Sequence, residues 1–126
     1  MKRVRGRTSI LVVGLVAGCG ALGVIGPKEV IAFDLDAIGA DGLVGPATGR
    51  RAVDYEFCIP VGDGYADEVR TIDPSAQVMA GSRGRIGCRR GEVLVVGNTH
   101  QAGWRYTLER LATLRYVKRI VRTDFE

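Results

Sequence analysis

The residues best suited to chemistry gather in one short stretch, 81–91, where arginines alternate with glycines. Guanidinium groups bind carboxylates and phosphates through paired hydrogen bonds, and glycines allow backbone amides to converge on an anion. The alternative is a solvated hairpin whose glycines serve turn geometry and whose arginines pair with nearby acids. No Gly-Lys-Ser/Thr follows, so the stretch is a poor match to a P-loop. The candidate anion-binding side chains are Arg83, Arg85, Arg89 and Arg90.

Two cysteines and the single histidine form a second candidate set. Cys88 or Cys58, paired with His100, would give a thiol and an imidazole for acyl transfer or redox catalysis. Against this, we expect His100 in the first turn of a helix, where a positive charge is disfavoured. Two cysteines in an exported domain are also more often a structural disulfide, and no Cys-x-x-Cys is present. A thiol enzyme therefore stays the alternative hypothesis.

Metal and cofactor sites find little support. One histidine and two cysteines cannot complete a four-ligand zinc site without carboxylates at unremarkable spacing. The run that begins at Asp34 and Asp36 resembles the start of a calcium loop, but Ile38 and Gly45 stand where oxygen ligands are required. We expect no metal and no cofactor.

The elements that position these residues follow from the apolar pattern after residue 52. Alternation over 53–59 predicts a half-buried strand, and helical spacing predicts a helix from an N-cap at Asp63 to Ile72. A short strand is expected over 76–80, a clear one over 92–96 and a last one over 116–121. Between the last two we expect a helix capped by Asn98 or Thr99, with an apolar stripe that includes Trp104.

This order is strand, helix, strand, strand, helix, strand, and it predicts an α+β domain over 53–126. The arrangement is that of a ferredoxin-like two-layer sandwich, with two helices on one face of a four-stranded sheet. A Cys58–Cys88 bridge would close about 30 residues and contribute about 3 kcal/mol. In the ferredoxin-like topology, however, we expect those residues at opposite ends of the sheet, about 15 Å apart. Bridged Cα atoms lie within about 7 Å, so one of the two expectations must fail.

The first 18 residues have the three parts of a secretory signal. Basic residues come first, an apolar run over 10–16 follows, and Ala17 and Gly18 supply a small-residue cleavage site. Val16-Ala17-Gly18-Cys19 resembles the lipobox of bacterial lipoproteins, which implies cleavage before Cys19 and acylation of its thiol. Residues 19–52, rich in Gly, Ala and Asp, are then expected to form a flexible tether. The alternative is an uncleaved membrane helix over 9–25, at the lower length limit and interrupted by glycines.

Charge distribution narrows the class of partner. Four of the 18 basic residues lie in the leader and no acid does, which leaves 14 basic residues against 14 acidic ones from residue 19 onward. Nucleic-acid binding therefore loses its main support and would require an uncleaved, cytosolic chain. The sequence instead predicts a domain of the bacterial cell envelope, anchored by lipid on the outer side of the inner membrane or in the periplasm. We expect a non-catalytic binding module for an envelope protein or an anionic ligand.

Overall fold

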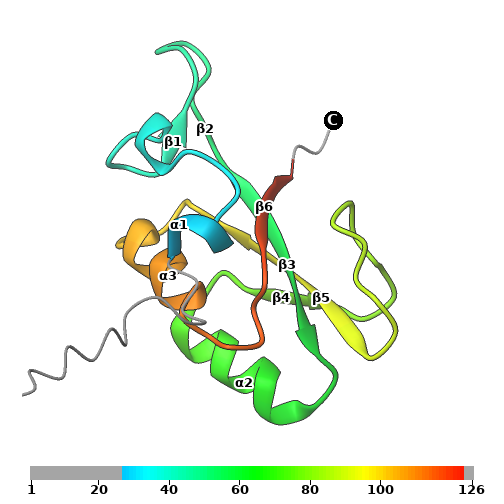
Figure 1. The fold of residues 1–126 in the computed structure, drawn as a ribbon. Coiled ribbons are helices and arrows are strands. Elements are labelled where there is room, and N and C mark those ends of the chain that lie inside the picture. The colour runs from blue at the N-terminus through cyan, green and yellow to red at the C-terminus, as the bar shows by residue number, and fades with distance from the viewer. Residues whose placement is uncertain (1–26, 124–126) are drawn as a thin grey trace, which may run out of the picture.

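The computed structural model describes residues 27–123, so the leader and Cys19 lie outside it. The described chain is a small α+β domain with antiparallel strands, drawn in Figure 1. Its main elements are β3 (Asp54–Pro60), α2 (Asp63–Ile72), β4 (Gln77–Met79), β5 (Glu92–Asn98), α3 (Trp104–Leu111) and β6 (Ile120–Thr123). Before them come α1 (Pro27–Val30), a 3-10 turn (Leu35–Ala37), β1 (Leu43–Val44) and β2 (Arg51–Ala52).

The four later strands form one antiparallel sheet in the order β4-β5-β3-β6. Alternate side chains of β3 point to opposite faces, as the sequence predicts. Tyr55, Phe57 and Ile59 are fully buried beneath the helices, in a core that also holds Leu108 and Leu111. Figure 1 shows α2 and α3 together on one side of the sheet and the β4–β5 loop on the other. The second face is therefore available to position functional groups.

The helix predicted over 63–72 is present, with one difference at its start. The N-cap is Gly62 rather than Asp63, and no side chain caps the first turn. The glycine has φ 145°, a value that side-chain-bearing residues rarely adopt. Asp63 is the first helical residue, where its charge still complements the helix dipole.

The second helix begins later than the sequence suggests. α3 starts at Trp104 after Gly103, not at Asn98 or Thr99. Thr99 is fully buried, and its hydroxyl accepts a hydrogen bond from the Val53 amide and donates one to the Gly42 carbonyl. Because this hydroxyl joins two other segments, it is not free to cap a helix. The Asn98 side chain accepts instead from the His100 amide, in a turn of its own.

The expected tether over residues 19–52 is wrong for its described part, residues 27–52, which we call the N-terminal arm. Val30, Ile31 and Ile38 are buried in the core, and Ile31 forms a parallel bridge with Ile120 of β6. Few apolar residues are needed for this packing, which is why the composition resembles a linker. The folded domain thus begins by residue 30 rather than at residue 53.

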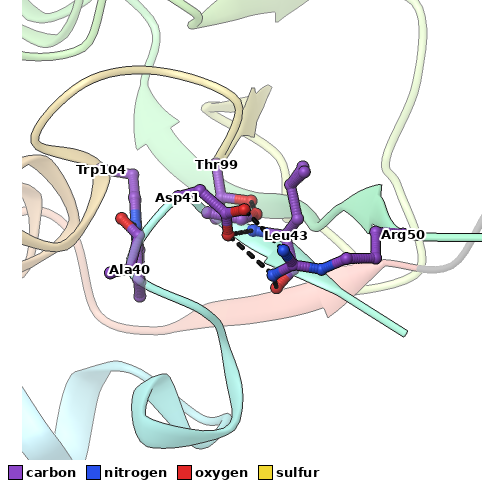
Figure 2. Close-up of polar contacts among 7 residues, drawn as sticks. Ala40, Asp41, Leu43, Arg50, Thr99 and Trp104 are labelled. Atoms are coloured by element: carbon purple, nitrogen blue, oxygen red, sulfur yellow. Dashed lines mark hydrogen bonds and ion pairs between the residues drawn. The ribbon is translucent and has the colours of Figure 1, made fainter. Parts of the chain in front are cut away.

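Polar contacts also hold the arm, as Figure 2 shows. The Trp104 indole donates to the Ala40 carbonyl at 3.1 Å. The Asp41 carboxylate accepts from the Leu43 amide and from both terminal nitrogens of Arg50, which lies nine residues further on. The Leu43 hydrogen bond, followed by Arg50, lowers the pKa of Asp41. These bonds close the β1–β2 hairpin and fix it beside α3.

Within residues 27–123 we find no helix long and apolar enough to cross a membrane.

Candidate functional site

The stretch between β4 and β5, residues 80–91, lies over the sheet face that the helices leave open; we call it the arginine loop. Two contacts attach it to β3. Cys88 forms a disulfide with Cys58, and the Ile86 amide donates to the buried Glu56 carboxylate at 2.6 Å. Glu56 and Cys58 lie two residues apart on β3, so both point to the sheet face that the helices leave open. The loop is therefore fixed against the sheet rather than projecting freely.

The disulfide corrects the expectation that Cys58 and Cys88 lie about 15 Å apart. β3 and β5 run antiparallel, so the end of the first strand pairs with the start of the other, and Pro60 lies opposite Glu92. The two Cα atoms are 5.5 Å apart, well within bridging range. The predicted disulfide is present, and the argument against it was wrong because it placed those strand ends at opposite ends of the sheet.

Gly84 lets the loop approach the sheet closely. It has φ +65°, and a Cβ built on it would lie 2.6 Å from the Leu94 side chain and 3.0 Å from a Glu56 oxygen. Only glycine fits both the backbone angle and the space. Further bonds order the loop: the Cys88 amide donates to the Arg83 carbonyl, and the Arg89 amide to the Glu92 carboxylate.

The four predicted arginines are all exposed, and the loop brings them together. None of their guanidinium groups has an ion pair or hydrogen bond with another residue of the described chain. This excludes, for residues 27–123, the alternative in which nearby acids pair with them. Other arginines do find such partners: Arg50 pairs with Asp41, and Arg105 with Asp36. The arginine loop thus presents four guanidinium groups that form no ion pair within the described domain.

Two hollows adjoin the loop. The first, about 580 Å³, is lined by Arg83, Arg89 and Arg90 together with Glu92. The second, about 380 Å³, lies between the loop and the open sheet face; Arg83 and Arg85 line it together with Glu56 and with apolar side chains of β4 and β5. Arg83 belongs to both hollows. The arrangement can hold an anion in the first hollow and an apolar group beside it.

His100 does not meet the cysteines. It is exposed in the turn after β5, whereas Cys58 pairs with Leu94 four residues before the end of that strand. At about 3.3 Å per residue, more than 10 Å of strand lies between His100 and the disulfide. Both thiols are also consumed in the bridge. Within residues 27–123 the geometry therefore offers no thiol–imidazole pair.

A buried polar network at the opposite end of β5 escaped the sequence analysis. Asp73 is fully buried and accepts hydrogen bonds from the Tyr55 hydroxyl, from the backbone amide and hydroxyl of Ser75, and from the Gln101 amide. Burial, and next the charge of Asp73, raises the pKa of Tyr55 well above its usual range. Asp73 directly precedes Pro74 at the end of a helix, which was the available signal. Because both Asp73 oxygens are paired, we assign the network to stability.

The acidic side chains at the 3-10 turn of the arm also have partners within the domain. Asp34 accepts from the Asp36 amide at the 3-10 turn, and Asp36 pairs with Arg105 at 2.7 Å. No group of three or more potential metal ligands occurs in residues 27–123. The Asp34 and Asp36 carboxylates, which make this run resemble a calcium loop, therefore serve the 3-10 turn and the ion pair with Arg105.

Comparison of the chain with protein-family models, with curated proteins and with solved structures finds no match.

Proposed function

We propose that this protein is an envelope lipoprotein whose domain binds an anionic partner through the arginine loop. One observation carries the proposal. Four arginines without partners in the described chain stand on a loop that a disulfide and the Ile86–Glu56 bond hold in place. A fixed loop loses little conformational entropy on binding, and guanidinium groups are suited to carboxylates and phosphates. Unpaired charge on a preorganised loop favours recognition over catalysis.

Export and acylation are the second part of the proposal. A basic start, an apolar run and Val16-Ala17-Gly18-Cys19 support them, and the remaining chain is neutral overall. The disulfide also suits an oxidising compartment. In this proposal Cys19 carries the lipid and the domain faces the outer side of the membrane.

The fold belongs, in this proposal, to the ferredoxin-like sandwiches. The order β4-β5-β3-β6 supports this, as does the presence of α2 between β3 and β4 and of α3 between β5 and β6. Such an arrangement puts both crossover helices on one face and leaves the other for the arginine loop.

Export is tested by the non-reducing intact mass of protein purified from the membranes of a bacterial host. We expect the mass of residues 19–126 plus acyl groups, less the two protons lost in the disulfide. A full-length chain with free thiols would contradict export, acylation and the bridge together.

Binding is tested by a pull-down from envelope extracts, with the same membrane-derived protein as bait. The loop variant replaces Arg83, Arg85, Arg89 and Arg90 with serine. A matched control removes four positive charges elsewhere, by serine at Arg51, Arg115, Lys118 and Arg119. We expect envelope components retained by the natural protein and by the control to be lost from the loop variant, and to be released by high salt. An unchanged set on the loop variant would contradict the role of the loop.

A further inference from the structure

We propose that the first hollow of the arginine loop binds a phosphate group that carries two negative charges. The inference rests on the proposed function, and it specifies the chemistry of the anionic partner. It is carried by the positions of Arg83, Arg89 and Arg90, which line one hollow of about 580 Å³. That space is ample for a phosphate and part of the molecule that bears it.

The charges around this hollow point to a doubly charged ligand. Three arginines line the hollow with one acid, Glu92, and one oxygen of Glu92 already accepts from the Arg89 amide. These three arginines and Glu92 together carry a net charge of +2, so a single carboxylate would leave one positive charge uncompensated. A phosphate monoester carries close to two charges at neutral pH and offers three acceptor oxygens. Arginine binds such oxygens in pairs, so three guanidinium groups suit one phosphate.

The hollow is also open enough for close approach. Gly81 and Gly91 line it, and a Cβ built on either would meet no atom within 4 Å. Ser82 adds a hydroxyl to the lining, which can donate to a phosphate oxygen. Polar atoms therefore surround the space, and no side chain of the described domain fills it.

The second hollow separates two sources of the phosphate. It shares Ser82 and Arg83 with the first hollow. Its sheet side is formed by Thr123, by Glu56, whose carboxylate already accepts from the Ile86 amide, and by Met79, Leu94 and Val96. An apolar chain attached to the phosphate would cover the last three side chains, whereas a short polar ester would leave them uncovered. Dihexanoyl phosphatidic acid and glycerol 3-phosphate share the head group and differ in this chain.

The test is a calorimetric titration of the membrane-derived protein in uncharged detergent, at constant ionic strength. The probes are inorganic phosphate, glycerol 3-phosphate, dihexanoyl phosphatidic acid and acetate. We expect the phosphates to bind more tightly than acetate. Arg89→Ser or Arg90→Ser should weaken phosphate binding about tenfold, since each removes a charge-assisted bond pair, while Arg115→Ser should not. Tighter binding of phosphatidic acid than of glycerol 3-phosphate identifies a lipid source; equal binding identifies a soluble one.

A pH series gives a second readout, which shows whether the doubly charged form of the phosphate is the one that binds. The second ionisation of a phosphate monoester has a pKa of about 6. The groups facing the hollow are Arg83, Arg89, Arg90 and Glu92, and Cys88 is bridged. The arginines keep their charge at these pH values. Affinity for glycerol 3-phosphate should therefore rise between pH 5 and pH 7, and affinity for acetate should not rise in this way.

Equal binding of acetate and phosphate, or full phosphate binding by Arg89→Ser and Arg90→Ser, would overturn the inference. The proposed function would survive that result if the loop variant still lost its envelope partner, because the partner would then be recognised through other anionic chemistry. If the arginine variants kept both phosphate binding and the envelope partner, the inference and the proposed function would both be contradicted.

Discussion

The Tyr55 ring lies against Gly97 on the helix-covered face of the sheet. A Cβ built on Gly97 would lie 2.4 Å from the ring, closer than atoms pack. Gly97→Ala should therefore lower the free energy of unfolding by about 1–3 kcal/mol, the usual cost of overpacking. The measurement is urea unfolding followed by Trp104 fluorescence. Gly64→Ala is the matched control: nothing lies within 4 Å of its Cβ, and we expect a gain of about 0.5–1 kcal/mol in α2. Equal effects at both positions would contradict the packing argument.

The Tyr55 hydroxyl donates to the fully buried Asp73 carboxylate. Tyr55→Phe leaves that oxygen without this partner, so we expect a loss of about 1.5–3 kcal/mol of stability at pH 7. The exposed Tyr106 provides the control, and Tyr106→Phe should change stability little.

The effect of Tyr55 depends on pH in a definite direction. The fold raises the pKa of its phenol above the ordinary value of 10.0, through burial first and then the charge of Asp73. The unfolded chain therefore ionises first as pH rises, and the natural protein loses stability above about pH 10. Tyr55→Phe lacks this ionisation, so the stability difference between the two proteins should narrow there. Urea unfolding from pH 7 to pH 11 measures it; a constant difference would contradict the shift.

Among the elements, the arginine loop depends most on one bond, the disulfide. Replacing Cys58 and Cys88 with alanine opens a loop closed over 30 residues, and we expect a loss of about 3 kcal/mol in unfolding free energy. Phosphate binding should weaken as well, because the arginines are then no longer held in one arrangement. Unchanged binding by a folded double variant would show that the hydrogen bonds of the loop order it without the disulfide.

How far the sequence predicts these elements depends on whether their signal is local. Alternation identified β3, and helical spacing identified α2, because both patterns lie within one run of residues. The last strand was placed too early. Tyr116 instead packs edge-on against Tyr65, with ring centroids 4.8 Å apart, and its hydroxyl donates to Glu68. Such contacts join α2 to the segment after α3 and leave no local trace.

The candidate site shows the same division between local signals, which the sequence reveals, and contacts between distant residues, which it does not. Arginine and glycine content singled out the loop, and cysteine number predicted the disulfide. The hollows did not follow, because they depend on how the loop folds over Leu94 and Val96 of β5. The Asp73 network was equally invisible, since its partners Tyr55 and Gln101 are 18 and 28 residues away along the chain.

For the whole molecule, we expect the N-terminal arm to unfold together with the rest of the domain. A chain that begins at residue 53 lacks the buried Val30, Ile31 and Ile38, and it leaves the Trp104 indole without its bond to Ala40. We expect it to show no sharp unfolding transition, whereas a chain that begins at residue 27 should unfold in one step. Circular dichroism during heating distinguishes them. A cooperative transition of the shorter chain would contradict this role of the arm.

Packing of the arm also limits the distance between Cys19 and the folded domain. Pro27, where the described chain begins, is the eighth residue after Cys19, and a fully extended chain advances at most about 3.6 Å per residue. A lipid on Cys19 would therefore hold the start of the folded domain within about 30 Å of the membrane. The composition alone suggests a longer spacer. An acylated protein of this kind would explore only the layer of solvent next to the bilayer. Its ligand would have to come from that layer, or be delivered to it.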